Sequence, residues 1–255
     1  MIHYPQMRII GLYENRMGKH TYVIGDIHGE LEQLKILLED MQLESVDELY
    51  VLGDVVDRGE YPIESLQLLM NLPNCICLAG NHECMALSNL RFLSNEITDD
   101  FLDNLSLEAI GKLEDWMRYN GGGTTLSGFM NLSLEERQEI LEFMENFELY
   151  VELEVCNQKY LLVHGGLDHF SEGKRLEEYT LEDFVWARPD YCVPYYKDTI
   201  VVTGHTPTQL IPGNDNPGYI YQKYNHIALD CGACFSEQGR LAGICLETGE
   251  CFYSR

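Results

Sequence analysis

The pattern of apolar and polar positions predicts three strand–loop–helix units in the first third of the chain. Residues 21–24, 48–52 and 75–79 are apolar runs of strand character, and each is followed directly by glycine. After each glycine-bearing loop, apolar residues recur at helical spacing. These helices are expected over residues 31–41, from Pro62 onward, and over about 83–92. Because successive βα units form parallel sheets, the three loops should meet at one sheet edge.

Residues 95–147 depart from this pattern, because helical spacing continues there without an intervening strand. One apolar helix face is predicted over residues 107–117, and Ser133 with Glu136 forms a capping box that begins another helix. Residues 120–123 are interpreted as a flexible junction. We interpret the region as a helical insertion beside the sheet, a lid or a wall facing substrate. No side chain in it indicates chemistry.

The chain beyond residue 148 is predicted to form mainly strands. Residues 150–155 and 159–163 should pair as a hairpin that turns at Asn157-Gln158. A helix opens at Thr180, and strands are then expected at residues 199–203, 227–230, 241–246 and 251–253, the last three as a meander. The predicted fold class is α/β, a sandwich of two mixed β-sheets flanked by helices.

The charge balance excludes several classes of function. The chain has 17 Lys+Arg against 42 Asp+Glu, a net charge of −25, which disfavours nucleic-acid and membrane-surface partners. No run approaches the roughly 18 apolar residues of a membrane span, and residues 1–10 lack the pattern of a signal peptide. We therefore expect a cytoplasmic protein, whose nine cysteines are reduced thiols.

Five loops that each follow a predicted strand carry side chains able to bind metal or move protons. In chain order they hold Asp26 and His28, Asp54, Asn81 and His82, His164, and His205. A single histidine beside glycine has an ordinary explanation as a turn residue. Five such loops at strand ends favour one shared metal site. Its oxygen and nitrogen ligands suit manganese, iron or zinc.

The loops GDIHG, GDVVDRG, GNHE, HGG and GHTP occur in this order and resemble those of the metallophosphoesterase superfamily. The resemblance is to its phosphoprotein phosphatase branch, and the compact bacterial and phage Ser/Thr/Tyr protein phosphatases are most similar. It extends from Gly25 to about Gly232. It implies a metallophosphoesterase-like sandwich in a single calcineurin-like domain, residues 1–255, with the helical insertion at about 95–147. The implied substrate is a phosphoprotein or phosphopeptide carrying phosphoserine or phosphothreonine, with phosphotyrosine as a further possibility.

The resemblance also implies a role for each loop residue in a site with two divalent metal ions, expected to be manganese. Asp26 and His28 would bind the first ion, Asp54 would bridge both, and Asn81, His164 and His205 would complete the second. A hydroxide between the ions would attack phosphorus. Arg58 and Arg188 would clamp the phosphate oxygens. His82, oriented by Asp57, would protonate the leaving oxygen.

Two other functions remain open from the sequence. A symmetrical diadenosine tetraphosphatase shares the five loops and would cleave a phosphoanhydride. A catalytically silent scaffold should lack a ligand or the proton donor, whereas every expected position is filled. The sequence does not predict the oligomeric state. Where the family usually has Asp-Thr-Gly, this chain has Asp230-Cys231-Gly232, so Cys231 is a candidate for sensitivity to oxidation.

Overall fold

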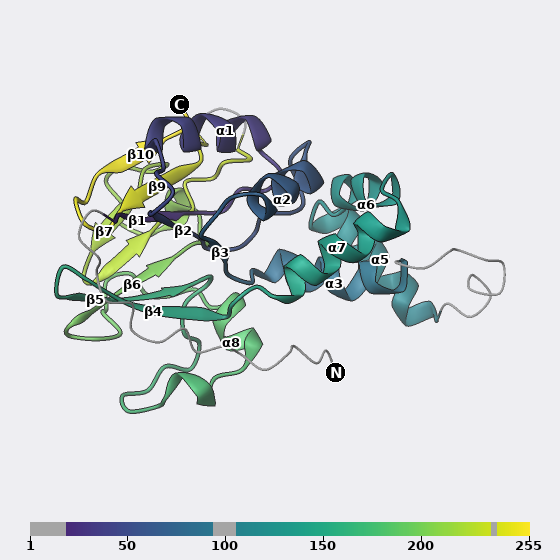
Figure 1. Ribbon diagram of the computed structural model, residues 1–255. Helices are drawn as coiled ribbons and strands as arrows, with labels where there is room; N and C mark the ends of the chain where they lie inside the picture. Colours follow the sequence, from purple (N-terminus) through teal and green to yellow (C-terminus); the bar gives the residue numbers. More distant parts are fainter. Residues whose placement is uncertain (1–18, 94–105, 236–238) are drawn as a thin grey trace.

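The computed structural model describes residues 19–93, 106–235 and 239–255, and it contains two five-stranded mixed sheets packed face to face (Figure 1). The N-terminal residues 1–10 and the first part of the predicted insertion, residues 95–105, lie outside the described residues. Within the described ranges, no helix is long and apolar enough to cross a membrane. The predicted fold class is confirmed.

The first sheet has the strand order β10-β9-β1-β2-β3. In that order its strands span Cys251–Tyr253, Ala242–Cys245, Thr21–Ile24, Glu48–Val51 and Cys75–Cys77. The β1, β2 and β3 strands are parallel, as predicted. Their carboxyl ends therefore lie at one edge of the sheet, which is where α/β proteins bind ligands.

The second sheet has the order β4-β5-β6-β8-β7. Its strands span Tyr150–Val155, Gln158–Val163, Thr199–Thr203, His226–Ala228 and Tyr221–Lys223 in that order. The predicted meander of closing strands is wrong, because β9 and β10 belong to the first sheet, where β9 pairs antiparallel with β1. The buried β1 would otherwise expose an unpaired backbone edge.

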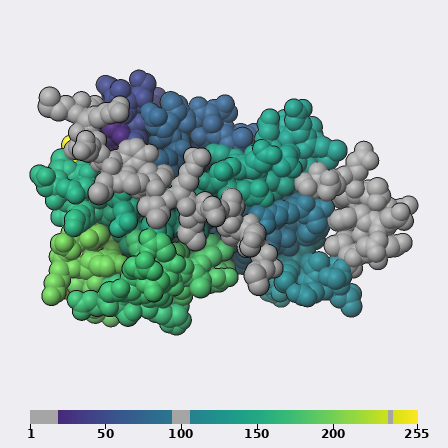
Figure 2. All heavy atoms as spheres, turned by 60° about the horizontal axis from the view of Figure 1, so that its bottom comes forward, coloured from purple at the N-terminus to yellow at the C-terminus, as the bar shows by residue number. Residues whose placement is uncertain are grey.

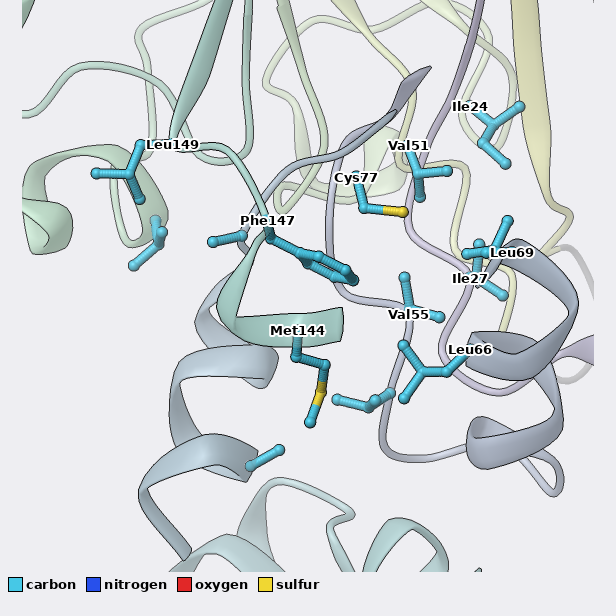
Figure 3. Packing of buried hydrophobic residues seen from close by; sticks show 14 of the residues in the cluster. Ile24, Ile27, Val51, Val55, Leu66, Leu69, Cys77, Met144, Phe147 and Leu149 are labelled. Carbon is cyan, nitrogen blue, oxygen red and sulfur yellow. The ribbon is translucent and has the colours of Figure 1, made fainter. Parts of the chain in front are cut away.

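Alternation along the strands divides the apolar side chains between two layers. Val23, Tyr50 and Leu162 point between the sheets, where they pack in one buried cluster. Their neighbours Ile24 and Val51 point away from the second sheet and pack against helices (Figure 3). Both faces of the central strands are thus buried, which explains why their sequences are continuously apolar.

Helices α1 (Leu31–Met41) and α2 (Pro62–Met70) contribute Leu34, Leu37, Leu66 and Leu69 to the core cluster that includes the outer face of the first sheet. Helix α8 (Leu181–Val185) packs Phe184 against Tyr150 of the second. The other α-helices within the described ranges are α3 (Asn81–Leu90), α5 (Leu107–Tyr119), α6 (Gly123–Met130) and α7 (Leu134–Glu145). These four gather beside the sandwich (Figure 1), and the teal and blue atoms at the right of Figure 2 show part of this lobe. Short 3-10 helices span Arg91–Leu93, Leu176–Glu178 and Thr208–Leu210.

Three local predictions need correction. Helix α3 begins at Asn81 rather than near residue 83, because the Glu83 side chain accepts the Gly80 N–H at 2.9 Å across the first turn. The hairpin turns one residue earlier than predicted, at Cys156-Asn157, where both residues have positive φ. On α5 the predicted apolar face is not the buried one: Leu107 is 88% exposed, whereas Trp116 is 1% exposed.

The approach of the two sheets generates a stability prediction with a matched control. A Cβ atom on Gly25, which follows β1, would lie 2.3 Å from the backbone oxygen of Leu229, which follows β8. Gly25→Ala should therefore destabilise the protein by about 1–3 kcal/mol through overpacking. Gly111 lies inside α5 with open space around it, so Gly111→Ala should stabilise the protein by about 0.5–1 kcal/mol. Urea denaturation measures both, and equal effects would contradict this account of the sheet contact.

Candidate active site

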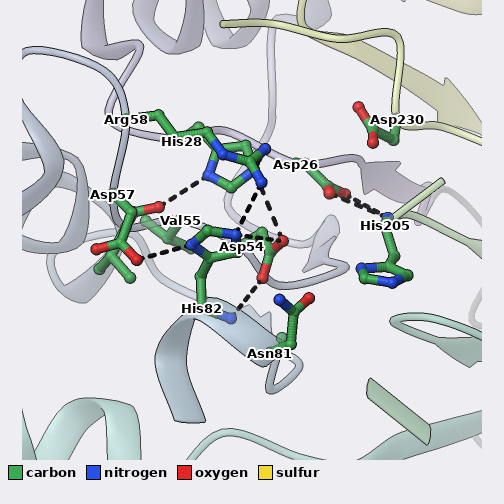
Figure 4. Close-up of polar contacts among 12 residues, drawn as sticks. Asp26, His28, Asp54, Val55, Asp57, Arg58, Asn81, His82, His205 and Asp230 are labelled. Carbon is green, nitrogen blue, oxygen red and sulfur yellow. Dashed lines mark hydrogen bonds and ion pairs between the residues drawn. The ribbon is translucent and has the colours of Figure 1, made fainter. Parts of the chain in front are cut away.

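The structure brings the predicted strand-end residues to one place (Figure 4). Asp26 and His28 follow β1, Asp54 follows β2, Asn81 and His82 form the first turn of α3, and His164 and His205 follow β5 and β6. All seven side chains are buried. The five loops therefore form one site, although they are spread over 180 positions of the sequence.

Two clusters of ligating atoms share a single carboxylate. The first contains His28, Asp54 and His82, the second contains Asp54, His164 and His205, and within each the potential ligating atoms lie within 4.8 Å of one another. Of these residues, His82 is the predicted proton donor and the other four are predicted ligands. The Asp54 carboxylate presents Oδ2 at 3.6 Å from His28 Nε2 and Oδ1 at 3.4 Å from His164 Nε2. A carboxylate with one oxygen toward each cluster has the chemistry to bridge two cations.

Asp26 and Asn81 lie at the second cluster. The backbone N–H of His205 donates to both oxygens of the Asp26 carboxylate, at 3.1 and 3.0 Å. The Asn81 Oδ1 atom lies 3.1 Å from His164 Nε2. Asp26, which the resemblance assigned to the same ion as His28, is thus held here by the loop that carries His205.

Backbone carbonyls orient two of the histidines. A carbonyl only accepts, so His28 donates its Nδ1–H to Val56 O at 2.9 Å and His164 donates its Nδ1–H to Leu52 O at 2.7 Å. In both rings Nε2 faces Asp54. This is the arrangement found in metal-binding histidines, whose second ring nitrogen is fixed by a hydrogen bond.

Burial and the neighbouring charges prepare these groups to act as ligands. Burial lowers the pKa of His28 to about 3, and burial together with His164 lowers that of His205 to about 3, so both rings are neutral at pH 7. Burial opposes ionisation of Asp54, but the His164 and His82 rings outweigh it and hold its pKa well below the usual range. Two of the imidazoles near the Asp54 carboxylate, those of His28 and His205, are therefore neutral and available as ligands.

The donor set fits divalent cations. Among the described residues, the buried His205 Nε2 atom has no hydrogen-bond partner. Burial disfavours protonated His164, but Asp54 outweighs this and raises the pKa of His164 to about 10. A cation between His164 and Asp54 would displace that proton, as metals do when they bind imidazole. The unpartnered His205 nitrogen and the Asp54 carboxylate that the two clusters share are suitable ligands for a binuclear site. Because the two clusters contain nitrogen and oxygen donors and no thiolate, they suit borderline or hard ions.

Glu83 is a functional residue that the sequence analysis did not single out. Its buried carboxylate accepts the backbone N–H groups of Asp54 at 2.8 Å, Val55 at 2.8 Å and Val56 at 3.2 Å. Burial and then the Asp54 charge raise its pKa to about 7. These bonds hold the Asp54 loop, whose φ of 50° is uncommon for a residue other than glycine. The sequence signal that could have identified Glu83 was its position in the loop GNHE, directly after Asn81 and His82.

Asp230, which the sequence showed only as part of Asp230-Cys231-Gly232 and without a role, lies near Asp26 in Figure 4. Burial, followed by the charge of Asp230, raises the pKa of Asp26 well above its usual range, and burial raises that of Asp230 to about 6. Its position just after β8 follows the strand-end rule that identified the other loops. The adjacent Cys231 is buried, and burial raises the pKa of its thiol, which argues against the predicted sensitivity to oxidation.

The His82 and Asp57 side chains form a buried pair beside the first cluster. His82 donates its Nδ1–H to Asp57 Oδ2 at 2.7 Å, and His82 Nε2 lies 4.0 Å from Asp54 Oδ2. Burial disfavours the imidazolium form, but the Asp54 and Asp57 carboxylates outweigh burial and raise the pKa of His82. A carboxylate that orients and charges an imidazole in this way makes it a suitable general acid.

Two exposed arginines border the two clusters. Arg58 donates an Nη1–H to His28 Nε2 at 2.7 Å, and its Nη2 atom lies 2.9 Å from His82 Nε2. Arg188 lies at the other cluster, 3.4 Å from the carbonyl oxygen of His205 and 3.2 Å from Thr206 Oγ1. Each guanidinium therefore lies beside one of the two clusters that share Asp54, and a guanidinium is a group that binds phosphate oxygens well.

Comparison with known proteins places the chain among metal-dependent phosphoesterases. A family model described as calcineurin-like phosphoesterase matches residues 19–232. A symmetrical bis(5'-nucleosyl)-tetraphosphatase from Erwinia tasmaniensis is 37% identical over 101 residues, which are 38% of this chain and 37% of that protein. Serine/threonine-protein phosphatase 2 from Salmonella typhimurium is 28% identical over 173 residues, 67% of this chain and 68% of that protein.

A solved structure described as that of a candidate diadenosine tetraphosphatase has the same fold, with a TM-score of 0.65, 17% identity and coverage of 97% of both chains. The match to the Erwinia protein spans little more than a third of that relative's length. The Salmonella match supports the predicted phosphoprotein phosphatase branch. Because the family model matches residues 19–232 of the 255, the chain belongs to the calcineurin-like phosphoesterase family.

Proposed function

We propose that the protein is a phosphoprotein phosphatase, which hydrolyses phosphate monoesters of serine and threonine. The observation that carries the proposal is the buried His82–Asp57 pair beside two ligand clusters that share Asp54. Such a site places a proton donor next to cation ligands, as ester hydrolysis requires. The Salmonella relative, named as a serine/threonine-protein phosphatase and matched over two thirds of its length, supports the substrate class.

The side chains divide the reaction between them. Divalent ions, when bound by this donor set, lower the pKa of an attached water and offset phosphate charge. Arg58 and Arg188 bind the non-bridging oxygens from opposite sides of Asp54. A water oxygen bonds to phosphorus and loses a proton while the bond from phosphorus to the leaving oxygen breaks. The leaving oxygen takes the electron pair and accepts a proton from His82 Nε2. Asp57 keeps the ring aimed through Nδ1. The products are inorganic phosphate and the free hydroxyl group.

A symmetrical diadenosine tetraphosphatase is the second candidate. The 37% identity to the Erwinia protein favours it, although the match covers only 38% of this chain. Both reactions use the same ligands and the same acid, so the geometry around Asp54 is common to them. Manganese is the ion we propose, with iron or zinc as alternatives that the ligands also suit.

A substrate panel separates the two candidates. With manganese present, phosphoserine and phosphothreonine peptides should give a higher kcat/KM than diadenosine tetraphosphate, and a phosphotyrosine peptide tests the wider range. The reverse order would assign the protein to the tetraphosphatases. Failure to hydrolyse all of these substrates and p-nitrophenyl phosphate would favour the silent scaffold.

His82→Asn tests the proton donor. The variant should lose roughly 10²- to 10⁴-fold in kcat, because the leaving oxygen would depart unprotonated. Its metal content should equal that of the wild type. His169→Asn is the matched control, since the side chain of His169 is 80% exposed and its loss should leave turnover unchanged. Full activity of His82→Asn would remove this residue from the reaction.

Asp54→Asn tests the shared ligand. The amide has one oxygen and one NH₂ group, so it cannot offer an oxygen to both clusters. We expect lower metal content by elemental analysis as well as a lower rate. Asp198→Asn changes an exposed carboxylate that pairs only distantly, at 3.8 Å, with Lys159, and should bind metal normally. Equal metal content in the two variants would show that Asp54 is not a ligand.

A further inference from the structure

Two helices of the helical insertion, α5 and α6, contact the Asp57 carboxylate. Trp116 of α5 donates its indole Nε1–H to Asp57 Oδ2 at 2.7 Å. Thr125 of α6 donates its hydroxyl to Asp57 Oδ1 at 2.7 Å and accepts the Asp57 backbone N–H at 2.9 Å. The sequence had indicated no chemistry in this region, so both contacts are a property of the tertiary structure.

The four groups form a closed polar network within the core. Asp57 and Thr125 are 0% exposed, while Trp116 and His82 are each 1% exposed. Oδ2 accepts from both Trp116 and His82, and Oδ1 accepts from Thr125. A carboxylate offers about four acceptor positions, so three donors leave it little freedom to rotate. In a buried network each such bond is worth more than it is in water.

Within residues 120–123, interpreted from the sequence as a flexible junction, Gly121 and Gly122 are packed tightly against other side chains. A Cβ atom on Gly122 would lie 2.2 Å from Trp116 Cε2, so the indole lies directly on the glycine backbone. The Gly121 carbonyl accepts the backbone N–H of Arg58 at 3.0 Å. The junction thereby supports Trp116 and Arg58 together.

The backbone at Asp57 requires such support. Asp57 and Arg58 have consecutive positive φ angles of 71° and 67°, a conformation that costs free energy for residues other than glycine. Without bonds from α5 and α6, this dipeptide would have conformations of lower energy available to it. Because the His82 ring is oriented by its hydrogen bond to Asp57, a change in the Asp57 conformation would also reorient the ring.

We propose that Trp116 and Thr125 are positioning residues, which hold Asp57 so that His82 points its Nε2 atom at the leaving oxygen. This role rests on the proposed phosphatase function. The helical insertion then acts as a support for the proton donor rather than as a lid. The leaving oxygen gains the His82 proton as its bond to phosphorus breaks, and the imidazole is reprotonated from water.

The test compares two substrates whose leaving groups differ in basicity. p-Nitrophenolate is a weak base and needs little protonation, whereas the phenolate released from phenyl phosphate is a stronger base that depends on the acid. Trp116→Phe and Thr125→Val should each lower kcat roughly tenfold to a hundredfold on phenyl phosphate, with little change in KM or in turnover of p-nitrophenyl phosphate. Thr125→Ser keeps the hydroxyl and should retain activity.

Two comparisons separate positioning from a general loss of structure. In a His82→Asn background, Trp116→Phe should cause no additional loss, since both changes remove the same proton transfer. Thr124→Val is the matched control, because the Thr124 hydroxyl lies 3.4 Å from the Gly121 carbonyl oxygen and not on Asp57. Equal losses on both esters, or losses that multiply in the double variant, would overturn the positioning role. If Trp116→Phe fails to fold, Thr125→Val and Thr125→Ser carry the same comparison.

An NMR measurement tests the positioning role without measuring turnover. In metal-free protein the His82 Nδ1–H proton, assigned by its absence in His82→Asn, should give a sharp NMR signal that broadens in Thr125→Val. An unchanged signal would also overturn the proposal. A wild-type protein inactive on both esters would instead overturn the proposed phosphatase function, which keeps the two failures distinct.

Discussion

The structure depends on one buried carboxylate that must remain charged. Asp54 is 2% exposed, and its desolvation is offset by the rings of His164 and His82. Its backbone conformation is held by three N–H bonds to Glu83 and by its carbonyl, which accepts from Ile27 and His28. Burying an ion in this way is costly unless its partners are in place, so the loops after β1, β2 and β3 must fold together.

The sandwich supplies the place where those partners meet. Parallel β1, β2 and β3 end at one edge of the first sheet, and the parallel strands β5, β6 and β8 bring their own loops to the same site. The loops of the first sheet carry five of the seven predicted residues, and those of the second sheet carry His164 and His205. The core between the sheets fixes the distance between the two ligand clusters that share Asp54, because close-packed interiors deform little.

A protein with a negative net charge that acts on an anion needs a positive electrostatic potential at its site. The net charge of −25 belongs to the whole chain, whereas the site has two exposed arginines and ligands for cations. Bound cations are the largest charges in such a site and dominate its local field. The outer surface can then be negative while the site attracts phosphate.

The sequence by itself determined the strand-end loops and the two-sheet class, because glycine beside a ligand residue and period-two or continuous apolar runs are local signals. It also identified His82, Asp57 and Arg58, which lie in loops with the recognisable order of the family. It missed the crossing of β9 to the first sheet, since strand pairing over more than 200 positions leaves no local trace. Only the tertiary structure placed Trp116 and Thr125 on Asp57, at separations of 59 and 68 positions. An apolar ring and a hydroxyl in a helix have no chemical signature until folding gives them an acceptor.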